Sequence, residues 1–220
     1  LLGLSGPALA QGLTKTCLDD ESAGEALELA VDSIGDIHLS RVLSSSRELV
    51  YTHVDPQGQV NNEIVTGPVS PFVGSRLIQT DIETEGSIPY ICFRDKLANR
   101  VRLAFKTGGN WSIETIQSSV TGDGCTLTID EGTIVVAYEA SGKLNLATRT
   151  APNNWQRQIV DSVSGQRVGV TPDMKISSAG HRVIAHRNRT QNVLRITENR
   201  DGVWRTVQAD HGFFNGGLEP

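Results

Sequence analysis

Short runs of alternating apolar and polar residues, separated by turn residues, extend along most of the chain and predict β-strands. Glycine and asparagine are frequent in the turns, where a positive φ is often required. The clearest stretch lies between residues 126 and 161, where four runs follow one another: Thr126–Asp130, Ile134–Tyr138, Leu144–Thr148 and Trp155–Asp161. This stretch therefore predicts a four-stranded antiparallel meander of about 40 residues.

The same unit recurs along the chain at a nearly constant interval. The turn after each first strand contains a glycine, and these glycines are 51, 46 and 48 residues apart: Gly35, Gly86, Gly132 and Gly180. The expected fourth strands begin 51, 44 and 49 residues apart, at Val60, Trp111, Trp155 and Trp204. The expected third strands begin 52, 43 and 50 residues apart, at Leu49, Val101, Leu144 and Leu194. The turn glycines, the third strands and the fourth strands thus recur at nearly the same interval in all four units, which indicates a repeat protein.

Repeats of four strands and about 40 to 50 residues are typical of β-propeller blades. A single meander has two partly apolar faces, and packing blade against blade around an axis buries both. We therefore predict an all-β fold, a β-propeller with four visible blades of four antiparallel strands, at about residues 24–70, 71–121, 122–169 and 170–216. The three tryptophans are expected to pack between neighbouring blades. Two β-sandwiches, the competing architecture, predict no such interval.

The two ends of the sequence suggest a location and an extent. Residues 1–10 end in Ala-Leu-Ala, the pattern of a signal-peptidase site, so we expect a signal-peptide remnant, then a linker at residues 11–23, and a secreted or periplasmic protein. At the other end, the Gly-x-x-Pro of residues 217–220 matches that of residues 169–172, which precedes a first strand. We therefore expect part of a larger propeller. A closed four-bladed ring and two chains completing one ring are the alternatives, and the oligomeric state stays open.

Composition argues against several classes of function. No run approaches the roughly 18 apolar residues of a membrane span. The net charge of −5 argues against a general nucleic-acid binder. The histidines and cysteines show no metal-binding spacing, so neither a metal nor a cofactor is predicted. We interpret Cys17, Cys92 and Cys125 as isolated buried or free thiols, and His38 and His186 as structural imidazoles within strands.

The turns before the tryptophans resemble a known motif. Asp201-Gly202-Val203-Trp204 is the closest match to the Ser-x-Asp-x-Gly-x-x-Trp box of Asp-box propellers, and the turns before Trp111 and Trp155 retain only the turn and the tryptophan. Over about residues 24–220 the chain resembles sialidase-like propellers and related exported bacterial repeat proteins. The resemblance implies a propeller fold in a group that includes sialidases and lectin-like binders. It carries no catalysis, because Asp-boxes are structural.

Candidate functional residues gather at the ends of the expected second strands. A sialidase-like site requires arginines for the substrate carboxylate, a tyrosine–glutamate pair and an acidic group. Residues of these types are Arg94, Asp95, Tyr138, Glu139 and Arg187, with Arg76 in a first strand. No spacing singles them out. Charged strand ends are therefore the favoured interpretation, and catalysis is the minority hypothesis.

The loops between second and third strands carry an excess of positive charge. They contain three acidic residues, Glu48, Asp95 and Glu139, and eight basic ones: Arg41, Arg47, Arg94, Lys96, Arg100, Lys143, Arg187 and Arg189. The turns at the opposite end are acidic: Asp32, Asp36, Asp55, Glu83, Glu85, Asp130, Glu131 and Asp201. Such a separation attracts an anionic partner to the positive end.

The sequence thus predicts an exported, non-catalytic propeller that recognises an anionic glycan or protein surface. The residues expected to contribute to the binding surface are Arg41, Arg94, Asp95, Tyr138, Glu139 and Arg187. The alternative is a sialidase-like glycoside-processing enzyme.

Overall fold

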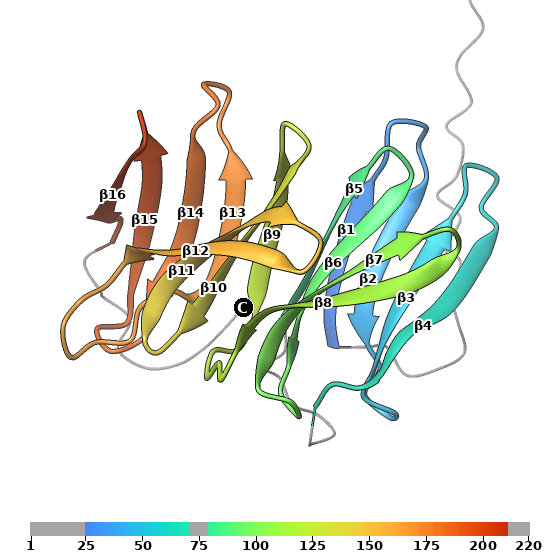
Figure 1. The fold of residues 1–220 in the computed structure, drawn as a ribbon, viewed down its shortest axis with the longest axis horizontal. Coiled ribbons are helices and arrows are strands. Elements are labelled where there is room, and N and C mark those ends of the chain that lie inside the picture. Colours follow the sequence, from blue (N-terminus) through green and yellow to red (C-terminus); the bar gives the residue numbers. More distant parts are fainter. Residues whose placement is uncertain (1–24, 71–78, 211–220) are drawn as a thin grey trace, which may run out of the picture.

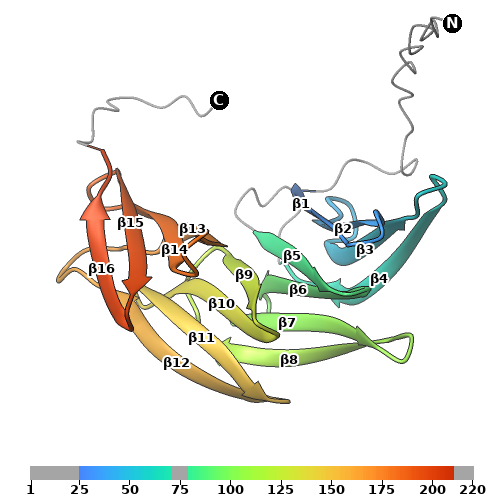
Figure 2. The same ribbon diagram turned by 90° about the horizontal axis from the view of Figure 1, so that it is seen from above.

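The computed structural model describes residues 25–70 and 79–210. Sixteen strands in this part of the chain form four separate sheets of four antiparallel strands, so the prediction of four-stranded blades is confirmed. The blades follow one another along an arc, with the first and fourth at its two ends (Figures 1 and 2). The described ranges contain no helix, hence no helical segment long and apolar enough to cross a bilayer.

In each blade the strands are in sequence order from the inside of the arc outward. Blade 1 contains β1 (Glu25–Val31), β2 (Ile37–Val42), β3 (Glu48–Val54) and β4 (Val60–Pro68). Blade 2 contains β5 (Thr80–Glu85), β6 (Ile88–Asp95), β7 (Arg100–Thr107) and β8 (Asn110–Ser118). Blade 3 contains β9 (Cys125–Asp130), β10 (Thr133–Ala140), β11 (Lys143–Ala151) and β12 (Asn154–Asp161). Blade 4 contains β13 (Val170–Ile176), β14 (Arg182–Asn188), β15 (Val193–Arg200) and β16 (Val203–Gln208).

The sequence anchors of the repeat occupy equivalent places in the blades. The four repeat glycines lie in the turns after β1, β5, β9 and β13, and all have positive φ: Gly35, Gly86, Gly132 and Gly180. The third and fourth strands begin at the predicted residues or one residue earlier. The periodicity of the sequence is therefore the periodicity of the blades.

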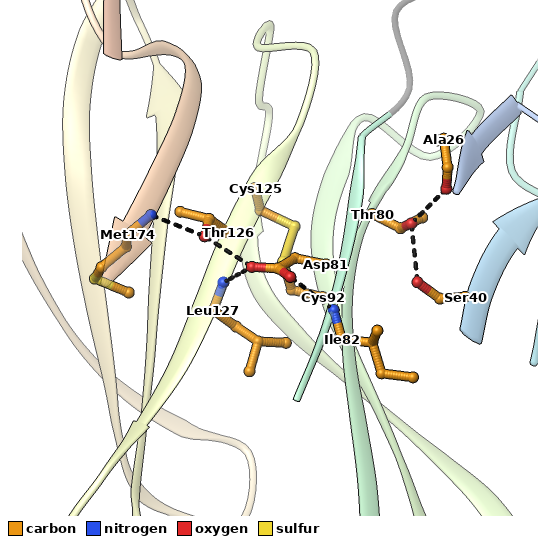
Figure 3. The surroundings of a disulfide bond; sticks show 10 residues. All are labelled: Ala26, Ser40, Thr80, Asp81, Ile82, Cys92, Cys125, Thr126, Leu127 and Met174. Carbon is orange, nitrogen blue, oxygen red and sulfur yellow. Dashed lines mark hydrogen bonds between the residues drawn. A yellow bond between two sulfur atoms is a disulfide. The ribbon is translucent and has the colours of Figure 1, made fainter. Parts of the chain in front are cut away.

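Polar contacts link the inner strands of successive blades (Figure 3). The Thr80 hydroxyl in β5 donates to the Ala26 carbonyl in β1 at 2.8 Å. Next to it, the Asp81 carboxylate accepts a hydrogen bond from the Thr126 hydroxyl at 2.7 Å and one from a backbone N–H of β9. The Thr126 hydroxyl oxygen in turn accepts the Met174 N–H of β13 at 3.2 Å. A continuous series of hydrogen bonds thus holds all four blades together near the axis of the arc.

An apolar core fills each of the three junctions between blades, and one tryptophan packs against each core. Trp111 contacts the core between blades 1 and 2, Trp155 that between blades 2 and 3, and Trp204 that between blades 3 and 4. Each is the second residue of its outer strand. The predicted equivalence of the three tryptophans is confirmed. Trp155 is the most enclosed, with 6% of its surface exposed.

The interpretation of all three cysteines as isolated thiols is wrong. Cys92 in β6 and Cys125 in β9 form a disulfide bond across the junction of blades 2 and 3 (Figure 3). Both side chains belong to the apolar core of that junction, which brings two distant sequence positions into contact. Other expectations lie outside the described residues: those for Cys17, for Arg76, for the signal-peptide remnant and linker, and for the C-terminal Gly-x-x-Pro.

The blades at the two ends of the arc each present an uncovered apolar face. In blade 1, Leu29 and Val31 are each 58% exposed and Ile64 is 60% exposed. In blade 4, Val207 is 62% exposed. The corresponding inner strand of blade 2 differs, because Ile82 packs against blade 1 and is only 1% exposed. Both ends of the arc are therefore surfaces of the kind that neighbouring blades cover elsewhere in the molecule.

Candidate functional site

The loops between second and third strands lie at one end of the blades, the lower end in Figure 1. The connections from blade 2 to blade 3 (residues 119–124) and from blade 3 to blade 4 (residues 162–169) reach the same end. We call this region the loop end. Arg94 and Glu139 enter it at the ends of β6 and β10, and Arg187 enters it at the end of β14.

Arg94 is a buried anchor of the loop end, with 3% of its surface exposed. Its guanidinium donates to four backbone carbonyls and one side-chain amide: those of Gly122, Asp95, Arg100 and Val120, and the Asn99 Oδ1. Burial lowers the pKa of this guanidinium, while nearby carboxylates oppose the shift. Because the acceptors come from the β6–β7 loop and from the 119–124 connection, Arg94 joins these two segments.

Glu139 is equally enclosed and is paired with an arginine from the next connection. Its Oε2 accepts hydrogen bonds from Arg167 Nε at 3.0 Å and Nη2 at 2.6 Å, and its Oε1 accepts the Gly142 N–H at 3.1 Å. The bonds to Glu139 raise the pKa of Arg167. A buried carboxylate is tolerated when it is paired and hydrogen-bonded in this way. Glu139 therefore holds the 162–169 connection in place.

Asp123, in the 119–124 connection, is surrounded by basic side chains. Arg167 Nη2 lies 3.2 Å from its carboxylate, Lys96 Nζ 3.7 Å and Arg189 Nη1 4.0 Å. Because Arg167 is shared with Glu139, two carboxylates stand among three cations, and the cluster keeps one positive charge in excess. Arg189 is the most accessible of them, since 53% of its side chain is exposed. The cluster is thus an electrostatically favourable position for an added anion.

A cavity of about 540 Å³ adjoins the cluster, between the β10–β11 turn and the 162–169 connection. The Val168 N–H donates to the Gly142 carbonyl at 3.0 Å and holds the two segments together. Gly169 is required here, because a Cβ atom would lie 2.7 Å from the Leu144 backbone. The lining is rich in hydroxyl groups and backbone: Ser141, Gly142, Lys143, Ser162, Val163, Ser164, Gly165 and Gln166. Such a lining offers hydrogen bonds to a hydroxyl-rich ligand.

The structure brings only some of the predicted binding residues together. Arg94 and Glu139 both border the 119–124 connection, where the backbone of Gly122 would meet that of Glu139 if it carried a Cβ. Arg187 is exposed and donates to the Asn192 side chain within its own loop. Tyr138 is buried in the core between blades 2 and 3, where desolvation raises the pKa of its phenol to about 12. Its side chain is part of the packing between the blades.

Asp95 and Arg41 bind groups other than Asp123. Asp95 accepts the Ala98 N–H at 2.9 Å and stabilises its own loop. Arg41 is 8% exposed and donates to Asn62 Oδ1 at 3.4 Å. Its neighbour Val42 packs into the core between blades 1 and 2, so Arg41 points to the opposite, uncovered face of blade 1.

Sequence reasoning missed the two residues that organise the loop end, Asp123 and Arg167. Both are in connections between blades, whereas the charged residues were sought in the loops within blades. A signal was present, because Asp123 stands between Gly122 and Gly124 and Arg167 closely precedes Gly169. A charged residue among glycines in a short connection indicates a backbone that approaches its neighbours closely.

Comparison with known proteins gives similarity in structure alone. No protein-family model matches the sequence, and no curated protein matches it. The Aleuria aurantia lectin, in complex with α-methyl-L-fucoside, has a TM-score of 0.58 and 12% sequence identity, over 87% of this chain and 63% of the lectin. Another structure of that lectin, described as a six-bladed β-propeller with a novel fucose recognition mode, gives a TM-score of 0.55. The chain has a β-propeller fold.

Propeller enzymes share the fold to a similar degree. A Hadza microbial sialidase has a TM-score of 0.57 and 11% identity, over 84% of this chain and 46% of the sialidase. The exo-β-1,3-galactanase of Phanerochaete chrysosporium has a TM-score of 0.56 and 10% identity, over 85% of this chain and 50% of the enzyme. The chain therefore spans less than two thirds of the lectin, the sialidase and the galactanase. Identities this low establish the fold, which hosts both binding proteins and enzymes.

Proposed function

We propose that this chain is an exported, non-catalytic β-propeller that binds an anionic glycan at its loop end. The observation that carries the proposal is the Asp123 cluster, which keeps one positive charge in excess beside a hydroxyl-lined cavity. A lectin and several carbohydrate-active enzymes among the structural neighbours favour a carbohydrate over a protein surface.

The residues at the loop end divide into supporting and contacting groups. Arg94 and Glu139 are buried and hold the loops, so they position the site and do not touch the ligand. The contacts come from exposed basic side chains, Lys143, Arg187 and Arg189, which attract a carboxylate or sulfate group. The serines of the cavity then bind ring hydroxyls. This division refines the predicted set of binding residues.

The Cys92–Cys125 disulfide supports export. Disulfides form and persist in oxidising compartments such as the periplasm and the extracellular space, and they are rare in the cytosol. The bond therefore agrees with the signal-peptide expectation from the first ten residues.

Binding to immobilised acidic and neutral polysaccharides at increasing salt concentration tests this function. The triple variant Lys143→Ala/Arg187→Ala/Arg189→Ala should lose at least tenfold in affinity for the acidic polysaccharide, and wild-type binding should weaken as salt increases. The matched control is Arg200→Ala, an exposed arginine at the opposite end of blade 4. An affinity that changes neither with salt nor in the triple variant would contradict the proposal. Equal affinities for the acidic and the neutral polysaccharide would contradict it as well.

A sialidase-like glycoside-processing enzyme is the second candidate, favoured by one observation. A cavity of about 370 Å³ on the axis of the arc is bordered by the carboxylates of Glu28, Asp81 and Asp173. Partial burial and the charges of the other two carboxylates raise the pKa of Glu28. Most glycoside hydrolases use two carboxyl groups, one of them protonated, whereas sialidases use a tyrosine nucleophile. The described residues that line this cavity include carboxylates and no tyrosine, so the lining favours glycoside processing by the two-carboxylate route. Asp81 is already occupied by three hydrogen bonds, which leaves Glu28 and Asp173 for chemistry.

Turnover of aryl glycosides, including sialosides, distinguishes the enzyme from the binding protein. An enzyme should release the aryl group at a saturable rate that Glu28→Gln and Asp173→Asn each abolish. The binding protein should show no turnover while retaining affinity for acidic polysaccharide.

A further inference from the structure

A third cavity lies between blades 1 and 2, at the end of the molecule opposite the loop end. It has a volume of about 200 Å³ and is reached from the turns that precede β2, β4 and β6. Its polar lining includes the side chains of Asp36, Asn61, Glu63 and Lys106, and Pro89 contributes an apolar wall. None of these residues takes part in the loop end or in the axial cavity.

The floor of the cavity is a hydrogen-bonded chain that fixes Tyr51. The Tyr51 hydroxyl lies 2.6 Å from His38 Nδ1, and His38 Nε2 faces Asp32 Oδ2 at 3.5 Å. The Asp32 carboxylate is itself held by the backbone N–H groups of Ile34 and Asp36, each at 3.0 Å. Burial lowers the pKa of His38, which favours the neutral imidazole. With the Nε2–H directed toward the Asp32 carboxylate, the Nδ1 lone pair faces the Tyr51 hydroxyl, which donates to it. The phenol oxygen keeps its lone pairs for an incoming donor.

The environment of Tyr51 keeps its hydroxyl protonated. Burial and nearby carboxylates raise the pKa of Tyr51, which remains a phenol throughout the physiological range. A phenol hydroxyl both donates and accepts hydrogen bonds, so it suits a cavity that binds a polar ligand.

The wall of the cavity is a second fixed group of polar side chains. Glu63 accepts hydrogen bonds from Lys106 Nζ at 2.6 Å, Trp111 Nε1 at 3.0 Å and Asn61 Nδ2 at 3.0 Å. Opposite it, Asp36 Oδ2 is bonded to His53 Nε2 at 2.7 Å. Glu63 is paired with the ammonium of Lys106, and the Asp36 carboxylate is hydrogen-bonded to the His53 ring, while Lys106 and Asn61 keep additional hydrogen-bonding groups. The lining therefore offers both donors and acceptors, and its carboxylates are already hydrogen-bonded.

We propose that this cavity binds a single uncharged, hydroxyl-rich ring, such as one monosaccharide unit of a glycan. Hydroxyl groups both donate and accept, and they match this lining. A charged group would compete for the Glu63–Lys106 ion pair and leave one member unpaired, which is costly in a partly buried site. Pro89 and the edge of Tyr51 meet the C–H face of the ring. The proposal uses residues separate from those of the loop end and stands independently of the glycan binding proposed there.

Trp111 provides a reporter for this cavity, because its indole N–H is bonded to Glu63 in the cavity wall. The protein contains three tryptophans, and the other two lie at the later blade junctions. In the ¹⁵N-labelled chain, the three indole resonances can be assigned by single Trp→Phe variants. Titration with the neutral methyl glycosides of fucose, galactose, arabinose and glucose should move the Trp111 resonance saturably for at least one sugar. The Trp155 and Trp204 resonances should stay in place.

Matched variants separate a built site from a non-specific effect. Asn61→Ala removes an exposed cavity residue and should weaken the binding at least fivefold, whereas Gln158→Ala, on the exposed outer strand β12, should leave it unchanged. The shift of the Trp111 resonance should also be unchanged at high salt and in the triple variant of the loop end. An unmoved Trp111 resonance with every neutral glycoside, equal movement of all three indoles, or unchanged affinity in Asn61→Ala would overturn the proposal. Loss of binding in the triple variant would assign it to the loop end instead.

Discussion

Cys92 and Cys125 are 33 residues apart in sequence and form a disulfide between blades 2 and 3 (Figure 3). Both are buried, and the bond lies within the apolar core of that junction. The two other junctions are held by apolar packing, hydrogen bonds and ion pairs. The middle of the described arc is therefore its covalently fixed part.

Removing this disulfide should lower the free energy of unfolding by about 3–4 kcal/mol, because the cross-link restricts the unfolded chain over a loop of this length. The measurement is urea unfolding of Cys92→Ser/Cys125→Ser beside the wild-type chain, each with and without reductant. The reductant should destabilise the wild-type chain and leave the double variant unchanged. Equal unfolding midpoints for oxidised and reduced wild type would contradict the bond.

The fold was predictable because it repeats. Each blade requires a turn glycine, an inner apolar strand and an outer strand that packs on the preceding blade. The residues that meet these requirements therefore recur once per blade along the sequence. Trp111, Trp155 and Trp204 thus occupy the same structural position, and their spacing in the sequence is the spacing of the blades. Contacts between blades follow no such pattern. Cys92 and Cys125 pair across a junction, where residue spacing contains no information about the partner.

The candidate site was predictable only in its location. The basic residues of the loop end are visible in the sequence, but their roles depend on backbone acceptors that the sequence does not display. The Arg94 guanidinium is hydrogen-bonded to carbonyl groups from two loops, and the Tyr138 side chain is buried in the core between two blades. Neither is available to a ligand. Asp123 and Arg167 become important because the connections that carry them meet in space. Which cations touch a ligand follows from burial, and burial is a property of the assembled blades.

Arg94 and Arg187, two arginines at equivalent strand ends, should differ sharply on substitution. Arg94→Ala leaves several buried carbonyls without a donor and should cost about 3–5 kcal/mol of stability. Arg187→Ala should change stability by no more than about 0.5 kcal/mol, because its side chain is exposed. Chemical denaturation of both variants provides the comparison. Similar losses in the two variants would show that Arg94 is not the anchor described above.

His186 should make stability depend on pH. It is buried between blades 3 and 4, where its Nδ1 accepts the Gly169 N–H and its Nε2 lies 2.9 Å from Thr197 Oγ1. Burial lowers its pKa from 6.5 to about 4. Between these two values the unfolded chain binds a proton that the folded chain does not. Stability should therefore fall as pH decreases from about 6.5 to about 4, and this loss is complete below that window.

The expected contribution of His186 is on the order of 3 kcal/mol over the window. Other acidic and imidazole groups also change protonation on acidification, so the test is a difference between two proteins. Urea unfolding of the wild type and of His186→Gln should be compared at several pH values from 7.5 downward. The gap between the two curves should narrow as the solution is acidified. A gap that stays constant would show that His186 does not cause the dependence.

The uncovered face of blade 1 should make the described chain self-associate. Leu29 and Ile64 lie on one face of that blade and are 58% and 60% exposed, whereas the matching faces of blades 2 to 4 are covered by the preceding blade. Sedimentation velocity should show association that grows with concentration, and Leu29→Thr/Ile64→Thr should reduce it. The control is Leu97→Ser, because Leu97 is 51% exposed but lies in the β6–β7 loop. Because the double variant changes two side chains and the control one, Leu29→Thr and Ile64→Thr should also be compared singly with Leu97→Ser, and each should reduce association more than the control does. Sedimentation as a monomer at every concentration would contradict the prediction. So would an equal reduction of self-association by Leu97→Ser.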